Sequence, residues 1–363
     1  MTDRQTQAAV SRDIAVIGWA QTEMVRHTDK SETQLLMDAI TGALEPLGLT
    51  RADVDFTCLG SCDYITGQAF SFVSNLDAIG AWPPKRDSHV EMDGAWALYE
   101  AWVRLQHGDI DSALVYAFGR SSQGDLGDVL VQQLDPYLLA PLAPDWVSLA
   151  ALQARALLDT GKCTEQDMAR IAARSRSAAN GSSGASAADL GQMARAPYTV
   201  EPLRDHDCPS NVDGASAAVL VAGDLARKVS RNPAWIRGID HRIEAHSLGV
   251  RDLTRSPSTA IAAKKAGAIG RSFDIAEIHA PFSHQEIILH EALGLDAKAA
   301  VNPSGGALAK HPFMVGGLNR IGEAATRVID GRARTALAHA TSGPCLQQNL
   351  VCVLESSQSG ASS

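Results

Sequence analysis

The chain has 363 residues and a formal net charge of −9 at neutral pH, with 45% hydrophobic and 20% charged residues. This composition is typical of a globular protein that can bury a large core or two packed halves. The negative net charge argues against a nucleic-acid-binding surface, although a local basic patch for cofactor phosphates stays compatible with it.

The sequence predicts a cytoplasmic protein with reduced cysteines. The first residues are polar and lack the apolar core of a signal peptide. The sequence has no run of about 18 apolar residues, so we expect no transmembrane helix. The six cysteines are sparse and lie mostly in apolar or strand-like surroundings, so we expect no disulfide framework. Cys58 and Cys62 are not followed by a second ligand pair, so we expect no metal site.

The first elements are a strand, a helix and a second strand. After a polar arm over residues 1–12, the apolar run DIAVIGWAQT indicates a buried strand. Ser31 is the predicted N-cap of a helix in SETQLLMDAITGALEPLGL, whose leucines and isoleucine share one face, and Gly48 closes it. The segment ADVDFTCLGS then indicates the second strand.

The same pattern returns about 220 residues later. AWIRGIDHRI is strand-like, PSTAIAAKKAGAIG indicates a helix closed by Gly, and FDIAEIHAP indicates another strand. The repeat predicts an α/β protein built from two similar βαβ-rich halves with parallel strands.

The region between the halves differs from both. LAALQARALLDTG and TEQDMARIAARSRSAA are strongly helical, with Thr164 as a predicted helix start, and residues 180–186 indicate a loop. We therefore expect a helical insertion on an α/β core and a disordered tail. The predicted boundaries are 13–118 for the first half, 119–200 for the insertion, 201–228 for the end of the first half, 229–355 for the second half and 356–363 for the tail.

Four segments resemble motifs of one family in the same order along the chain. The most specific is HAPFSHQEIILHEALGL, in which His279, Phe282, Ser283, Glu286 and the ending EALGL match, whereas Ala280 and Pro281 depart. The others are the Asn-Pro-Ser-Gly-Gly element from Asn302 with its His-Pro pair at His311, the segment PLRDHDCPSNVDGASAAVLV, and the helical insertion. One residue is missing before His311, where the family usually has Gly.

These segments resemble the thiolase superfamily, most closely its sterol-carrier-protein and lipid-transfer branch, over about residues 13–355. The resemblance implies a five-layered αβαβα architecture with a helical loop-domain insertion. It also implies a dimer or tetramer, because thiolases of this type usually assemble so.

The nucleophile of the family is missing. Family members that form an acyl-enzyme carry a Cys at the start of a buried helix, where the helix N-terminus favours the thiolate. In HVEMDGAWALYEAW, Gly94 and Ala97 hold the family frame, so Glu91 falls on the Cys and Asp93 on the Ser or Thr. The second family Cys falls near Gly343, and Cys345 lies two positions away.

The resemblance implies that the groups stabilising a thioester enolate remain. His311 and His279 match the positions that hold the thioester oxygen in thiolases, and two imidazoles in a dry pocket can serve as donors. Asn302, Ser304, Gly305 and Gly306, together with Gly343, are the expected substrate-loop residues. Each candidate also has a purely structural interpretation: the histidines as satisfied loop residues, and Glu91 or Asp93 as helix caps.

The leading hypothesis is therefore retro-aldol cleavage of a β-hydroxyacyl-CoA from a steroid or lipid side chain, with CoA as part of the substrate and no tightly bound cofactor. Glu91 or Asp93 is the first choice of base, with Tyr116, His284 or His339 as second choices. The resemblance implies a small OB-fold, zinc-ribbon partner subunit, or a homodimer or heteromer. Two alternatives stay open, a non-catalytic subunit that binds acyl-CoA and an acetyl-CoA acyltransferase.

Overall fold

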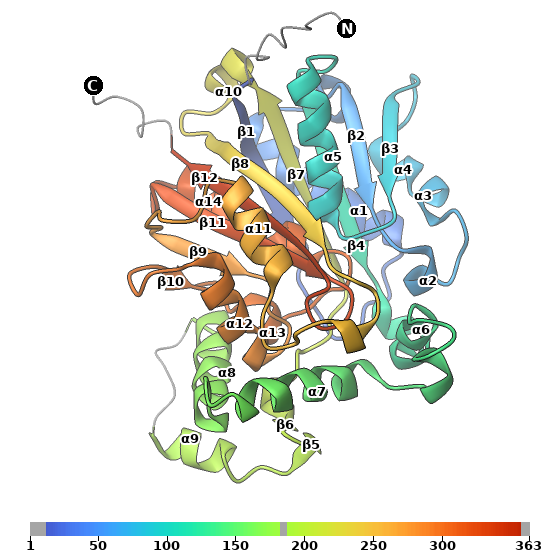
Figure 1. Ribbon diagram of the computed structural model, residues 1–363. Coiled ribbons are helices and arrows are strands. Elements are labelled where there is room, and N and C mark those ends of the chain that lie inside the picture. Colours follow the sequence, from blue (N-terminus) through green and yellow to red (C-terminus); the bar gives the residue numbers. More distant parts are fainter. Residues whose placement is uncertain (1–11, 182–186, 357–363) are drawn as a thin grey trace, which may run out of the picture.

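The computed structural model describes residues 12–181 and 187–356 (Figure 1). Almost all of the predicted arm and tail, and most of the predicted loop at 180–186, lie outside the described residues. The strands are β1 (Ile14–Gln21), β2 (Phe56–Gly60), β3 (Arg86–Val90), β4 (Ser112–Gly119), β5 (Tyr198–Val200), β6 (Leu203–Arg204), β7 (Gly214–Ala222), β8 (Ala234–Ile243), β9 (Ile275–Ile278), β10 (Ala300–Val301), β11 (Thr335–Ser342) and β12 (Gln348–Glu355). The helices are α1 (Glu32–Leu44), α2 (Asp63–Thr66), α3 (Ser71–Ser74), α4 (Leu76–Ile79), α5 (Gly94–His107), α6 (Leu126–Gln132), α7 (Trp146–Asp159), α8 (Glu165–Ala179), α9 (Ala187–Met193), α10 (Gly223–Val229), α11 (Pro257–Lys265), α12 (Ser283–Leu293), α13 (Gly306–Ala309) and α14 (Gly316–Ile329).

The main sheet repeats one strand order twice. Its order is β10-β9-β11-β12-β8-β1-β7-β4-β2-β3. When the main-sheet strands of each half are counted in chain order, both halves read first, fifth, fourth, second and third from the centre of the sheet outward. The halves meet between β1 and β8 through two residue pairs, Ala15–Trp235 and Val16–Ala234. The β1-α1-β2 unit therefore corresponds to β8-α11-β9, which is the repeat that the sequence predicts.

Helices cover both outer faces of the sheet halves and fill the space between them. Helix α1 packs on β1, β4 and β7, and α11 packs on β8 and β12. Helices α5 and α14 contact each other and the inner faces, and their apolar side chains belong to one buried cluster. This is the predicted αβαβα arrangement. Small residues let α5 pack closely on β2, because a Cβ on Gly60 of β2 would lie only 2.6 Å from Cα of Gly94 in α5.

The predicted helix starts are confirmed by their caps. The Ser31 hydroxyl accepts from the Gln34 N–H, and the Thr164 hydroxyl accepts from the Asp167 N–H, each within a capping box. An N-cap of this kind contributes about 1 kcal/mol to helix stability. Gly48 ends the α1 region in the left-handed conformation, with φ of 67°.

The segment between β4 and β7 forms a helical layer at one end of the molecule. In Figure 1, α7, α8 and α9 lie below α12 and α13. Buried alanines of α7 and Met168 of α8 pack against Phe282, which directly precedes α12. The insertion is therefore held against the second half of the chain, next to its His279 motif.

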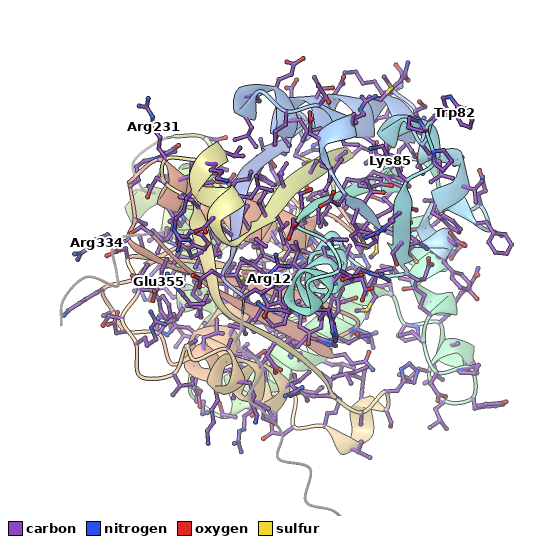
Figure 2. The ribbon with its side chains drawn as sticks, turned by 90° about the horizontal axis from the view of Figure 1, so that it is seen from above. Arg12, Trp82, Lys85, Arg231, Arg334 and Glu355 are labelled. Atoms are coloured by element: carbon purple, nitrogen blue, oxygen red, sulfur yellow. The ribbon has the colours of Figure 1, made fainter. Side chains whose placement is uncertain are left out.

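The two halves of the sheet extend to opposite sides of the molecule. Seen from above, Trp82 and Lys85, which precede the edge strand β3, lie on the opposite side of the molecule from Arg334 and Glu355 (Figure 2). All six cysteines are free thiols in the structure. Within the described ranges, no helix is both long and apolar enough to span a membrane.

Candidate active site

A cavity of about 150 Å³ lies where α5 and α14 begin and where β9 and β11 end. Asp93, His279 and His311 line it together with Gly343, and most of its remaining wall is apolar. Four other predicted site residues (Asn302, Ser304, Gly305 and Gly306) are not among the described residues that line it, and neither is Glu91. The fold thus gathers four of the nine predicted residues around one cavity.

The two histidines form a directed hydrogen-bond pair. The Thr341 N–H donates to His279 Nδ1 at 3.3 Å, so that nitrogen carries no proton. His279 Nε2 is then the protonated nitrogen, and it donates to His311 Nδ1 at 3.4 Å. The remaining proton of His311 must lie on Nε2, for which the described residues supply no hydrogen-bond partner. The pair therefore presents one imidazole N–H donor to the cavity.

Both imidazoles are neutral over a wide pH range. Burial lowers the pKa of His279 well below its usual value, and the neighbouring His311 and Arg320 lower it further. Burial lowers the pKa of His311 to about 3, and the Arg320 charge acts in the same direction. The donor is thus a neutral imidazole, which can stabilise developing negative charge without first losing a proton.

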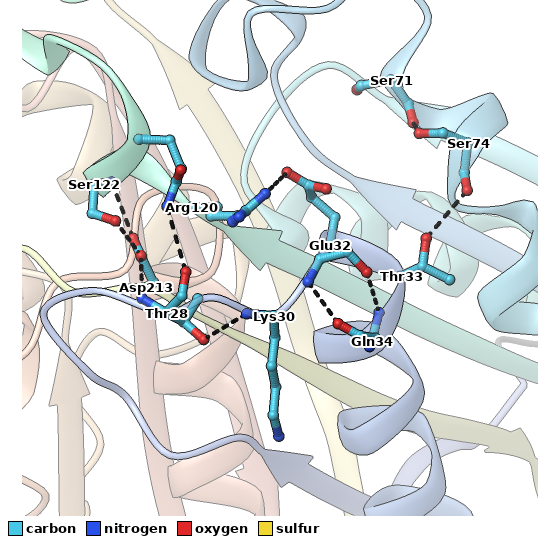
Figure 3. A network of polar contacts seen from close by, with 12 residues as sticks. Thr28, Lys30, Glu32, Thr33, Gln34, Ser71, Ser74, Arg120, Ser122 and Asp213 are labelled. Atoms are coloured by element: carbon cyan, nitrogen blue, oxygen red, sulfur yellow. Dashed lines mark hydrogen bonds and ion pairs between the residues drawn. The ribbon is translucent and has the colours of Figure 1, made fainter.

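The backbone around His311 is fixed by β-bridge pairing. His311 N–H donates to the Ser210 carbonyl at 2.8 Å, and Val212 N–H donates to the His311 carbonyl at 3.3 Å. The next residue, Asp213, is fully buried and accepts from the N–H groups of Thr28 at 3.2 Å and Ser122 at 3.1 Å, and from the Ser122 hydroxyl (Figure 3). Asp213 therefore anchors the strand segment that holds His311.

Gly316 leaves the space that the histidine pair occupies. A Cβ at this position would lie 2.8 Å from His279 Nε2 and 3.4 Å from His311 Nδ1. Gly316→Ala should therefore displace the imidazoles and lower turnover at least about tenfold, because small misplacements of catalytic groups are costly.

The test compares Gly316→Ala with Gly124→Ala by steady-state kinetics. Gly124 has no described atom within 4 Å of its added Cβ and a negative φ, so it tests the generic effect of the extra methyl group. Equal turnover in the two variants would show that Gly316 does not position the pair.

Asp93 joins the N-termini of two helices from different halves. Its Oδ1 accepts from the N–H groups of Ala95 at 2.8 Å and Leu318 at 3.1 Å, and its Oδ2 accepts from the Gly317 N–H at 2.9 Å. It is the N-cap of α5 and is 2% exposed. Burial raises the pKa of Asp93, and the three backbone donors oppose that shift. Three of its four lone-pair positions are filled, so one stays available to the cavity that it lines.

Glu91 lies outside this arrangement. Its side chain is 46% exposed and 3.7 Å from His89, and its Oε1 accepts from the Asp63 N–H at 2.6 Å. Of the two carboxylates that the sequence offers at the nucleophile position, Asp93 alone reaches the cavity.

The Asn-Pro-Ser-Gly-Gly element does not line the cavity, and its side chains bond to the strand that leads to His279. Asn302 accepts from the Ile278 N–H at 2.7 Å, next to His279 in the chain, and donates to Glu286 at 3.0 Å. Ser304 donates to Glu277 at 2.7 Å, and Glu277 forms a buried ion pair with Arg320 at 2.6 Å. Gly305 and Gly306, with φ of 94° and 67°, turn the chain into α13.

Gly343 and Cys345 belong to a loop between β11 and β12 that lines the cavity. Gly343, Cys345 and Leu346 all have positive φ, and the Arg251 guanidinium donates to the Pro344 carbonyl at 3.1 Å. The Cys345 thiol donates to the Leu149 carbonyl at 3.3 Å, and burial raises its pKa to about 12. It is therefore a protonated thiol at neutral pH and a poor nucleophile.

Replacing Cys345 by Ala should leave turnover within about threefold of the wild type, because the thiol supplies no reacting atom. Alanine keeps the Cβ at this left-handed position and removes only the sulfur. Kinetics before and after treatment of the wild type with a thiol-alkylating reagent provide the second measurement. A loss of turnover above 100-fold in Cys345→Ala would instead indicate that the thiol stabilises the transition state by about 3 kcal/mol.

The second-choice bases do not line the cavity. Tyr116 is buried in β4, and burial near Asp87 and Cys58 raises its pKa well above 10. His284 pairs with Gln153 at 3.2 Å, and His339 pairs with Asn349 at 3.0 Å. These three side chains are buried in the core and do not face the cavity.

The sequence did not indicate the aromatic wall of the cavity. Trp146 of the insertion packs edge-on against Phe282 at 4.9 Å and against Phe313 at 5.7 Å. Phe282 and Phe313 each follow a histidine motif closely, which is the signal that could have found them. Trp146 carries no such signal. In the described part of the chain, no three His, Cys, Asp or Glu side chains are grouped as metal ligands would be.

Comparison with known proteins finds similar enzymes. No protein-family model matches the chain. It is 26% identical over 375 residues to an acetyl-CoA acetyltransferase of Methanothermobacter thermautotrophicus, covering 92% of this chain and 97% of that protein. It is 28% identical over 244 residues to a steroid side-chain-cleaving aldolase of Thermomonospora curvata, covering 62% of this chain and 60% of that protein.

Two solved structures share the fold. The Ltp2-ChsH2(DUF35) aldolase superposes with a TM-score of 0.78 at 20% identity, over 96% of this chain and 98% of that one. The human mitochondrial 3-ketoacyl-CoA thiolase superposes with a TM-score of 0.74 at 17% identity, over 95% of this chain and 99% of that one. With the duplicated strand order and the central helix pair, these likenesses show that the chain has the thiolase fold and is similar in sequence to enzymes of the thiolase superfamily.

Proposed function

We propose that this protein is a lyase that cleaves a β-hydroxyacyl-CoA by a retro-aldol reaction. The observation that carries the proposal is the pairing of a neutral imidazole donor, His311, with a buried carboxylate, Asp93, on one cavity. Such a site can take a proton and stabilise an enolate, and neither step needs a covalent acyl-enzyme. The similarity to an aldolase in sequence and to another in structure supports the same reaction class.

In this mechanism Asp93 takes the proton of the β-hydroxyl group through its open lone pair. The β-carbon becomes a carbonyl, the Cα–Cβ bond breaks, and its electron pair moves into the thioester as an enolate. The His311 N–H donates to the enolate oxygen, while His279 holds the imidazole in the required tautomer. Return of the proton from Asp93 to Cα gives the shortened acyl-CoA. A positioned base supplies about 10²–10⁴-fold acceleration, and one oxyanion donor about 10²–10³-fold.

We further propose that the enzyme works as a complex. The structural neighbour named Ltp2-ChsH2(DUF35) aldolase is named for two components. By analogy, a small OB-fold, zinc-ribbon subunit would present the acyl-CoA to this chain, with a homodimer as the other arrangement.

The test is to incubate the purified protein, alone and with such a subunit, with β-hydroxyacyl-CoA thioesters. Mass spectrometry should detect a shortened acyl-CoA and an equimolar aldehyde or ketone. Asp93→Asn should abolish the products. The Asn oxygen can still accept from Ala95 and Leu318, but its NH2 group cannot accept from the Gly317 N–H, so circular dichroism is needed to show that the variant stays folded. Glu91→Gln, a change of the same kind outside the cavity, should keep wild-type turnover. Failure to release carbonyl product from every thioester, with the partner present, would overturn the proposal.

Two other functions have a specific observation in their favour. The acetyl-CoA acetyltransferase relative favours acyl transfer, but this reaction needs a thiolate, and the pKa of Cys345 is about 12. The three backbone bonds of Asp93 favour a purely structural carboxylate in a non-catalytic subunit. In that case Asp93→Asn would lower stability and leave the turnover of the complex unchanged.

A further inference from the structure

The insertion supplies the wall that faces His311. The Trp146 ring lies nearly parallel to the His311 imidazole, with 6.3 Å between centroids and 22° between planes. Phe313 lies on the imidazole at 4.6 Å, and Phe282 closes the corner against Trp146 at 4.9 Å. The His311 imidazole is therefore flanked by the Trp146 and Phe313 rings, and Phe282 packs against Trp146 in the same wall.

These rings leave a small space for the substrate. The cavity volume is about 150 Å³, and Leu149, Phe282 and Phe313 in its wall are each less than 10% exposed. An apolar protein cavity of about 150 Å³ accommodates a benzene molecule. A fused four-ring system has roughly three times as many carbon atoms and needs a correspondingly larger space. Protein interiors resist such enlargement because neighbouring side chains are closely packed.

We propose that the enzyme selects β-hydroxyacyl-CoA thioesters with a compact apolar group on the β-carbon, no larger than a phenyl ring, and that Trp146 sets this limit. The aromatic wall favours a flat ring, which gains edge-to-face contacts with Trp146 and Phe313. The inference rests on the proposed function for the identity of the thioester. The predicted substrate carries a compact group on the β-carbon, whereas the aldolase relative is named for cleaving steroid side chains.

The experiment measures binding with thioesters that cannot undergo retro-aldol cleavage. Saturated acyl-CoA analogues without the β-hydroxyl group, carrying a methyl, a phenyl or a steroid-sized substituent on the β-carbon, are titrated by calorimetry. The wild-type protein, with its partner subunit where one is required, should bind the phenyl analogue at least about tenfold more tightly than the steroid-sized one. Trp146→Ala should reverse this preference, and Trp146→Phe should change it less.

Trp82→Ala is the matched control. Trp82 is 86% exposed and lies at the periphery, beside the edge strand β3 (Figure 2), so its removal should leave all three affinities unchanged. Tighter binding of the steroid-sized analogue by the wild type would overturn the inference, as would an unchanged preference in Trp146→Ala. Selective binding without cleavage of the corresponding hydroxyacyl-CoA would overturn the proposed function and keep the size limit.

Discussion

Lowering the pH from 6.5 to 5.5 is expected to reduce the free energy of unfolding by about 4 kcal/mol. Four fully buried histidines cause this effect. Burial lowers the pKa of His284 and His311 to about 3 and that of His339 to about 4, and it lowers that of His279 well below 6.5. All four stay neutral in the folded protein at pH 5.5, whereas each takes up a proton in the unfolded chain, for about 1 kcal/mol apiece.

The sign follows from proton uptake. Between the folded and unfolded pKa values the unfolded state binds more protons, so stability is present above about pH 6.5 and is lost as the pH falls. Burial also lowers the pKa of the buried His206 and the half-buried His241, which act in the same direction. Burial raises the pKa of Glu277 and Asp93, and these carboxyl groups act in the opposite direction.

Urea unfolding at pH 7.5, 6.5 and 5.5 measures the effect. His284→Gln should reduce the pH dependence by about a quarter, because one of the four groups no longer titrates. His107→Gln is the control, since His107 is exposed at the end of α5 and should leave the dependence unchanged. An unchanged pH dependence in His284→Gln would contradict the neutral, buried state of His284.

His311→Ala is expected to lower kcat by about 10²–10³-fold, the cost of removing one donor to a developing oxyanion. KM should change much less, because the hydrogen bond strengthens only as negative charge develops on the thioester oxygen. Steady-state kinetics on the β-hydroxyacyl-CoA that the enzyme cleaves give both constants.

His284→Gln is the matched control for this variant as well. His284 is equally buried and has a similarly lowered pKa, but it pairs with Gln153 outside the cavity. Its kcat should stay within about threefold of the wild type. If both variants lost activity equally, the loss would reflect damage to the fold, and the donor role of His311 would be wrong.

Much of the fold was predictable because it follows local patterns. The strand–helix–strand repeat is encoded by apolar periodicity and by the Ser31 cap, so two similar halves could be expected. The Thr164 cap likewise marked a helix of the insertion. The resemblance also located His279 and His311, which the structure brings within 3.4 Å of each other. Both histidines belong to short sequence motifs.

The rest of the site depends on contacts between distant segments. Glu91 and Asp93 are two residues apart and equally plausible in the sequence, and the N-terminus of α14 distinguishes them by donating two N–H groups to Asp93. The ion pair between Glu277 and Arg320 joins β9 to α14. The position of Trp146 over His311 requires the insertion to fold back on the second half. None of these pairings has a local signal.

The sharing of Asp93 between α5 and α14 has a consequence for how such a protein can diversify. The carboxylate comes from one repeat, the imidazoles come from the other, and the cap bonds tie both to the same point. In the proposed mechanism the reaction chemistry is therefore a joint property of the duplicated core, and neither repeat can change its part alone. Trp146 of the aromatic wall belongs to the inserted helices, which contribute no reacting group. Substrate range can thus drift with the insertion while the chemistry stays constrained by the duplication.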